Sequence, residues 1–268
     1  MTTEIITAAP VVDRPLHIES EPETVRNERR WKARSDEGEE LLLAQLLPEL
    51  AGDESLRRRY VYEAERLAAI ESSSLAEVLA IGPKPDPRDP MSAAPWGLRR
   101  VPSGQRLDRV LQERAPLPVD QAIGLLTSLA EAVHRLHLAG LVLRDLEPRS
   151  IVLGDRDSVT ITDVGLARVE ILSSRTASSL LLESSAYAAP EHLRATVVDA
   201  RADVYTLGAI AWQALSGVLP YDEGSPFVRD YEALPNLRDL RDRVPDGLDE
   251  LLRSCLSADP DARPKSAT

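Results

Sequence analysis

The chain has 268 residues, of which 43% are hydrophobic, so it can bury the core of one large domain or of two lobes. Its formal net charge of -12 argues against a general nucleic-acid-binding protein, which needs a basic surface. Its single cysteine excludes an internal disulfide, and no stretch approaches the roughly 18 apolar residues of a membrane span. The N-terminus lacks the basic start and apolar run of a signal peptide, and we therefore expect a cytoplasmic protein.

The first hundred residues are predicted to form strands and one helix. Residues 1–13 show no periodic pattern and are interpreted as a tail. The apolar run at 41–47 ends at a proline, which favours a buried strand. Asp53 is placed to cap a following helix, whose apolar residues recur at helical spacing as far as Ile70. Residues 82–95 contain five prolines, which is typical of a loop between strands.

The rest of the chain is predicted to be mostly helical. Residues 120–138 place their apolar side chains on one face of a helix, and Gly140 follows where a C-terminal cap belongs. Residues 151–161 hold two short apolar runs around a polar turn, which is typical of a hairpin. Residues 203–216 and 248–256 are predicted to be two further helices. The second of these holds the lone cysteine at an apolar position, so we expect a buried core thiol.

One octapeptide resembles the catalytic loop of the eukaryotic-type protein kinases. Residues 143–150 are Leu-Arg-Asp-Leu-Glu-Pro-Arg-Ser, and Asp-Val-Gly follows at Asp163. The family pattern is His-Arg-Asp-Leu-Lys-Pro-x-Asn, followed by Asp-Phe-Gly. Four further segments resemble family signatures in the right order, namely residues 136–140, 188–191, 203–208 and 259–264. In the family, the arginine of the last segment, Arg263 here, pairs with the glutamate at the position of Glu191.

The resemblance covers residues 15–268 and is to the bacterial Ser/Thr protein kinases. It implies an α+β fold of two lobes, with a small β-rich N-lobe at 14–100 and a larger helical C-lobe at 101–268. It also implies one more helix in the C-lobe than the sequence holds, so we expect a piece of a longer protein.

The groups that hold the nucleotide in this family are missing from the matching positions. The chain has no glycine before Gly38, although the family places a glycine-rich loop there. Carboxylates that would repel phosphates lie in that segment, namely Glu21, Glu23 and Glu28. The position of the phosphate-binding lysine holds Ala44, and Glu63 matches that lysine's glutamate partner. Leu42 replaces an alanine that packs on adenine, and we expect it to fill the base pocket. Lys32 is either a relocated lysine or a solvated strand residue.

The catalytic loop keeps the position of its base but loses two other groups. Asp145 matches the base and Asp163 the metal-binding aspartate, so either the pair holds a cation or each satisfies backbone amides in a turn. Glu147 replaces a lysine that neutralises the transferring phosphoryl group, which reverses the electrostatic contribution. Ser150 replaces an asparagine that binds a second magnesium ion, and a hydroxyl is a weaker ligand.

A phosphorylation switch is a further hypothesis from the resemblance. In active relatives, the arginine at the position of Arg144 grips a phosphorylated residue of the segment that corresponds to 163–191. The hydroxyl groups of that segment here include Ser173, Ser174, Thr176, Ser178 and Ser179. A phosphate there would pair with Arg144 and order the segment. The alternative is that Arg144 only caps backbone carbonyls.

Three hypotheses for the function follow. The first is a pseudokinase, a regulatory or protein-binding module in signalling that is inactive or nearly so and needs no cofactor. The second is a weakly active Ser/Thr kinase that uses ATP and Mg²⁺, with Asp145 as base, Asp163 as metal ligand and Lys32 as lysine. The third is a structural domain that links other domains of the same chain. The expected partners are proteins, rather than nucleic acid or a membrane, and nucleotide binding separates the first two hypotheses.

Overall fold

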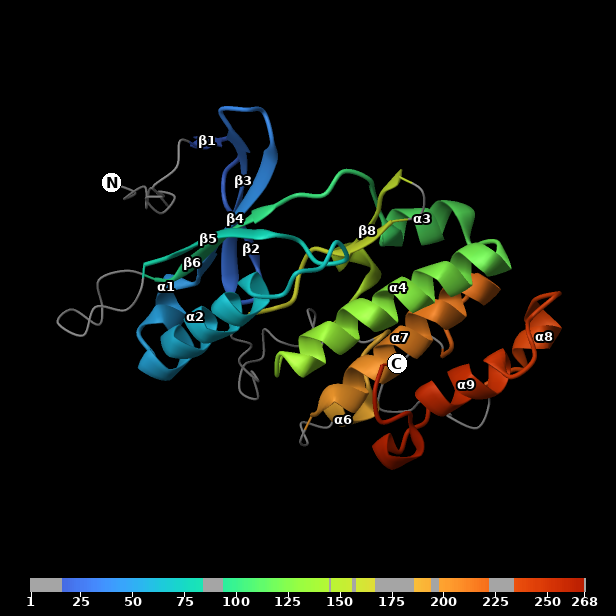
Figure 1. The fold of residues 1–268 in the computed structure, drawn as a ribbon. Coiled ribbons are helices and arrows are strands. Elements are labelled where there is room, and N and C mark those ends of the chain that lie inside the picture. Colours follow the sequence, from blue (N-terminus) through green and yellow to red (C-terminus); the bar gives the residue numbers. More distant parts are fainter. Residues whose placement is uncertain are drawn as a thin grey trace, which may run out of the picture. The chain divides into compact units, whose positions relative to one another are not determined.

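The computed structural model divides the chain into two compact units near Pro102, with the short segment Ser72–Leu75 assigned to the second unit. The residues that the structure describes are 16–83, 94–144, 146–155, 158–166, 186–193, 198–221 and 234–267. The predicted tail at 1–13 and most of the predicted proline-rich loop lie outside them. Strands form most of the first unit and helices most of the second (Figure 1), so the predicted α+β class is confirmed.

The first unit holds an antiparallel sheet, six-stranded within the described residues, in the order β1-β3-β4-β6-β5 with β2 paired to β3. The strands are β1 (Leu16–Ile18), β2 (Glu23–Val25), β3 (Glu28–Ser35), β4 (Glu40–Leu46), β5 (Val78–Gly82) and β6 (Trp96–Arg100). Strand β4 coincides with the predicted buried strand. Two helices, α1 (Pro48–Ala51) and α2 (Glu54–Ala68), follow it along the chain.

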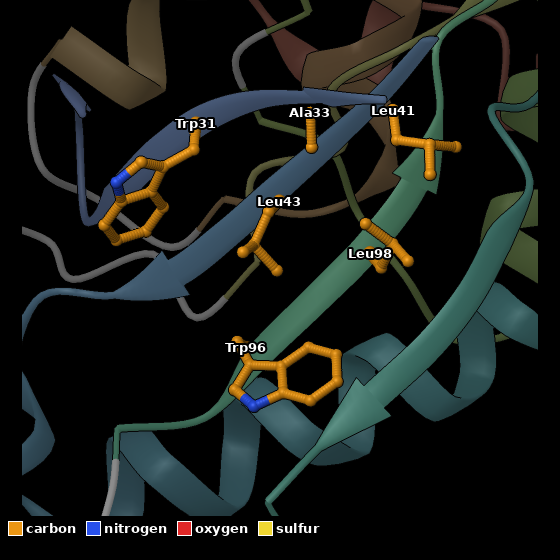
Figure 2. Packing of buried hydrophobic residues seen from close by; sticks show 6 residues of the cluster. All are labelled: Trp31, Ala33, Leu41, Leu43, Trp96 and Leu98. Atoms are coloured by element: carbon orange, nitrogen blue, oxygen red, sulfur yellow. The ribbon is translucent and has the colours of Figure 1, made fainter. Parts of the chain in front are cut away.

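Alternation along the strands separates two faces of this sheet. One face carries a buried apolar cluster (Figure 2), which consists of Trp31, Ala33, Leu41, Leu43, Trp96 and Leu98. Their neighbours along the strands point to the other face, because successive strand side chains alternate. The phenol of Tyr60, from α2, donates to Glu28 on that second face. We call this second face the α2 face, and its residues are Glu28, Arg30, Lys32, Leu42, Ala44 and Arg99.

Helix α2 begins where the sequence predicted. The carboxylate of Asp53 accepts hydrogen bonds from the amides of Ser55 and Leu56, at 2.8 and 3.2 Å. Such a cap satisfies amides that have no partner within the helix. The helix ends at Ala68, two residues before the predicted end, and its buried side includes Tyr60.

The second unit is built around helices. They are α3 (Leu107–Arg114), α4 (Val119–Leu138), α6 (Pro190–Leu193), α7 (Ala200–Ser216), α8 (Leu237–Leu240) and α9 (Leu248–Cys255), with 3-10 turns at Pro148–Ser150 and Pro260–Ala262. The strands are β7 (Gln105–Arg106), β8 (Ile151–Leu153) and β9 (Val159–Ile161). The antiparallel pairing of β8 with β9 confirms the predicted hairpin. Gly140, with φ of 75°, follows α4 as predicted.

Helix α7 is the buried centre of this unit, and it lies beside α4 (Figure 1). It begins three residues before the predicted start, because Asp199 caps it by accepting the amide of Arg201 at 2.9 Å. The predicted core thiol is confirmed: Cys255 on α9 is buried, and burial raises its pKa to about 11. Within the described part of the chain, no helix combines the length and the apolar character of a membrane span.

The apolar cluster predicts a large difference between two positions near the end of β6. Leu98 is fully buried and Val101 is 36% exposed. Leu98→Ala should lower the free energy of unfolding by about 2–5 kcal/mol, because it leaves a cavity. Val101→Ala, the matched control, should change it by less than about 0.5 kcal/mol. Urea denaturation measures both, and equal effects would contradict the described packing.

Candidate functional site

The position predicted to have lost its lysine lies on the α2 face. Ala44 is fully buried, and its cross-strand partners are Arg30 on β3 and Gly97 on β6. Leu42 is half-buried on the same face, opposite Lys32. Lys32 itself is exposed. The residue directly beside the lysine position is therefore Arg30, a cation of this face that sequence reasoning did not identify.

A network of charged and polar side chains fills the α2 face beside Ala44. Glu28 is buried, and its Oε1 accepts hydrogen bonds from the Tyr60 hydroxyl at 3.0 Å and from Arg99 Nη2 at 3.2 Å. Its Oε2 accepts from Nε and Nη2 of Arg30, at 2.9 and 2.6 Å. Burial, together with the negative charge of Glu28, raises the pKa of Tyr60 well above its usual value. Glu28, one of the carboxylates expected to repel phosphates, is thus paired with two arginines, and the repulsion stays a prediction.

A tight turn stands where the family has its glycine-rich loop. Val25 and Glu28 pair across β2 and β3, so only Arg26 and Asn27 join the strands. Arg26 has a left-handed φ of 57°, as two-residue hairpin turns require. The carbonyl of Asn27 accepts the amide of Leu47 at 2.8 Å, which ties the turn to the end of β4. The sequence showed that this segment lacks glycine, but not that a two-residue turn is formed here or that it is bonded to the end of β4.

Glu63, matched to the glutamate that pairs with the lysine, has a partner on its own helix. Nε of Arg59 lies 2.7 Å from Oε1 of Glu63, one helical turn away. Pairs of this spacing contribute a few tenths of a kcal/mol to a helix.

A buried aspartate on α7 holds the backbone of the catalytic loop in the second unit. Asp203 is completely buried; its Oδ1 accepts the amide of Arg144 at 2.7 Å and its Oδ2 the amide of Leu143 at 2.9 Å. Nε2 of His137, on α4, lies 2.8 Å from the same Oδ2. Arg144 has a φ of 65°, a left-handed conformation that these bonds stabilise. Asp145, the predicted base, lies outside the described residues.

The two altered groups of the catalytic loop interact within the loop. Glu147 is buried, and its carboxylate contacts Arg149 through Oε1–Nη2 at 3.0 Å and Oε2–Nε at 2.9 Å. The hydroxyl of Ser150 donates to the carbonyl of Glu147 at 2.9 Å. The carbonyl of Ser150 accepts the amide of Thr162 at 2.8 Å. Ser150 thus closes the 3-10 turn and links it to the segment after β9.

Asp163 takes part in a backbone turn. Its Oδ1 accepts the amide of Gly165 at 2.9 Å, and Gly165 has a left-handed φ of 57°. This contact agrees with the structural interpretation of Asp163. The alternative, that Asp163 and Asp145 hold a cation together, stays a prediction. Among the side chains that the structure describes, no group of three His, Cys, Asp or Glu residues is arranged to hold a metal ion.

The predicted pair between the last signature and α6 is confirmed. Nη1 and Nη2 of Arg263 donate to the two carboxylate oxygens of Glu191, at 2.7 and 2.9 Å. The guanidinium also lies 5.0 Å from the ring centroid of Tyr205 on α7. The hydroxyl residues of the proposed switch lie outside the described residues, namely Ser173, Ser174, Thr176, Ser178 and Ser179.

Comparison with known families agrees with these signatures. The family described as protein kinase domain matches residues 99–268, more than half of the chain. The chain belongs to the protein kinase family. The solved structure of Rad53 residues 1–466 with AMP-PNP is similar in fold, with a TM-score of 0.69 at 19% identity, over 94% of this chain and 62% of that one. The first unit is thus a kinase N-lobe and the second a kinase C-lobe.

Bacterial serine/threonine-protein kinases are among its relatives. PknL of Mycobacterium tuberculosis is 30% identical over 214 residues, which is 78% of this chain and 52% of PknL. RqkA of Deinococcus radiodurans, described as DNA damage-responsive, is 32% identical over 80% of this chain and 32% of RqkA. PknB of Mycolicibacterium smegmatis is 28% identical over 83% of this chain and 36% of PknB. The chain therefore spans about a third to a half of the length of these relatives.

The anchor on α7 predicts a local effect on the catalytic loop. Asp203→Asn places an amide group among donors that need an acceptor, which should lower the free energy of unfolding by about 1–3 kcal/mol. Hydrogen exchange at Leu143 and Arg144 should become faster. Asp120→Asn is the matched control, because Asp120 is exposed on α4. Unchanged exchange at both amides would contradict the anchoring role.

Proposed function

We propose that this chain is a pseudokinase domain, a protein kinase fold that serves as a regulatory or protein-binding module in signalling and has lost phosphoryl transfer, or nearly so. The observation that carries the proposal is the α2 face of the sheet. There, a buried alanine, Ala44, takes the position of the phosphate-binding lysine, and the cations beside it, Arg30 and Arg99, are bonded to Glu28. Fold alone would not support this proposal, since one fold serves many functions.

The residues that would surround ATP and Mg²⁺ do not fit these groups. Kinase catalysis depends on positioning the phosphates and neutralising their charge. Strand β4 offers no cation at Ala44, and the turn at Arg26 and Asn27 lacks the glycines that let a backbone approach phosphates. Leu42 occupies the position of the adenine-packing alanine, and the hydroxyl of Ser150 is bonded within its own turn.

A weakly active Ser/Thr kinase is the second candidate. It is favoured by Asp203, which holds the loop that carries the base position through two backbone amides. Lys32 lies on the α2 face, two residues along β3 from Arg30, the cross-strand partner of Ala44. In this candidate, Asp145 is the base and Lys32 supplies the missing cation. The names of the relatives agree with it, because those proteins are described as kinases.

The partners of the pseudokinase are proposed to be proteins, including other domains of a longer chain. The surface proposed for regulation is the segment 163–191, which would respond to phosphorylation through Arg144. The backbone amide of Arg144 donates to Asp203. The proposal of the switch itself is supported by the sequence.

The first test is nucleotide binding. Isothermal calorimetry with ATP and Mg²⁺ should give no saturable heat up to millimolar nucleotide, because the phosphates find no free cation on β4. A dissociation constant below about 10 µM would contradict the proposal. An active bacterial Ser/Thr kinase domain, titrated in the same buffer, is the positive control.

The second test is phosphoryl transfer. Radiolabel from ATP should not appear on the protein or on generic substrates, and Asp145→Asn should leave this background unchanged. Ala44→Lys should not create activity, because Glu147 and the short turn remain. Incorporation that disappears in Asp145→Asn would instead support the active-kinase candidate.

A further inference from the structure

Two arginines from different strands converge on one carboxylate in the interior of the first unit. Arg30 is the cross-strand partner of Ala44, and Arg99 is the cross-strand partner of Leu42, so both point to the α2 face. Their side chains are 12% and 2% exposed, and the side chain of Glu28 between them is 3% exposed. These charges are thus held away from solvent, beside the position where the family holds phosphates.

The arrangement around Glu28 has the properties of a binding site for an oxyanion. Each of its two oxygens accepts two hydrogen bonds, from Tyr60 and Arg99 on one side and twice from Arg30 on the other. The donors come from α2, β6 and β3, so they converge from three elements. Buried, charge-assisted donors of this kind bind carboxylate and phosphate groups strongly.

We infer that the α2 face contains an oxyanion site that the protein fills with its own Glu28 carboxylate. The ligand class of the site is a carboxylate or phosphate group. This inference deepens the proposed function: the internal carboxylate takes the role of the nucleotide phosphates as the anion beside the lysine position. Because Tyr60 of α2 bonds the same carboxylate, the helix is joined to the sheet without any nucleotide. The comparison of the Glu28 carboxylate with nucleotide phosphates is the one part of the inference that rests on the proposed function.

An ordinary structural ion network differs from such a site in one measurable respect. A site that recognises an oxyanion should accept a free anion once the tethered one is removed. Glu28→Ala removes the carboxylate and leaves space, whereas Glu28→Gln removes the charge but keeps that space filled. The two variants therefore separate loss of charge from opening of the site.

The experiment is anion rescue of thermal stability. Both variants should have a lower Tm than the original chain in chloride buffer, because the two arginines lose their buried counter-charge. Sodium formate or inorganic phosphate, at an ionic strength matched with chloride, should raise the Tm of Glu28→Ala by roughly 5 °C or more. The same salts should raise the Tm of Glu28→Gln and of the original chain by less than half of that. If Glu28→Ala is unfolded in chloride, it should refold when formate is supplied.

Three results would overturn the inference. They are an equal rise of Tm in Glu28→Ala and Glu28→Gln, no rise in Glu28→Ala, and an unfolded Glu28→Ala chain in every anion. Adding Arg30→Ala to Glu28→Ala should abolish the rescue, and a rescue that persists would also overturn it. Glu49→Ala, which removes an exposed carboxylate 3.5 Å from Arg29, controls for the change in net charge.

The results of the anion-rescue experiment are independent of the test of the proposed function. Saturable binding of Mg²⁺ and ATP to the original chain would contradict the loss of nucleotide binding, whatever the variants show. Failure of anion rescue would overturn the internal anion and would leave the nucleotide result as it stands.

Discussion

The buried carboxylate of Glu28 is the constraint on which the first unit depends. Removing a carboxylate and a guanidinium from water costs several kcal/mol per ion, so such a group is tolerated only when its oxygens are fully bonded. Tyr60, Arg30 and Arg99 meet that requirement, and each comes from a different element. This one anion thus joins α2 to the sheet through Tyr60 and brings both arginines to the same carboxylate.

The second unit also contains buried carboxylates, which here connect helices and a loop. Asp203 joins α7 to the backbone of Leu143 and Arg144 and to His137 on α4, and Glu191 joins α6 to Arg263. In both cases a buried carboxylate connects segments that are far apart in the sequence. These anchors lie in the segments that carry the kinase signatures, and they stabilise the fold itself. The groups that the proposed function takes to be missing, such as a lysine at Ala44, differ from the anchors because in the family they stabilise only bound nucleotide.

Local signals predicted much of the fold because their physical causes are local. The cap at Asp53, the apolar strand at 41–47 and the hairpin at 151–161 each depend on a few adjacent residues. Helix α7 starts three residues earlier than predicted, because Asp199, a typical capping residue, accepts the amide of Arg201.

The candidate site was harder to predict, because its main feature depends on strand register. The resemblance predicted that Ala44 stands at the position of the family's lysine, but not that Arg30 lies opposite it or that Arg99 shares Glu28. A carboxylate in a glycine-free loop suggested repulsion, and only the pairing of β2 with β3 shows that the chain turns before Glu28 and buries it. Periodicity assigns a residue to a face, but it does not identify the neighbours on that face.

The tight packing of Ala44 has a consequence for any longer side chain at this position. A lysine here would enter a fully buried site and meet two guanidinium groups that are already bonded to Glu28. Because both guanidinium groups share that carboxylate, the added ammonium group would be a buried charge without a counter-anion of its own. The neighbours of Ala44 therefore disfavour a cation at this position through the stability of the fold, independently of any bound ligand.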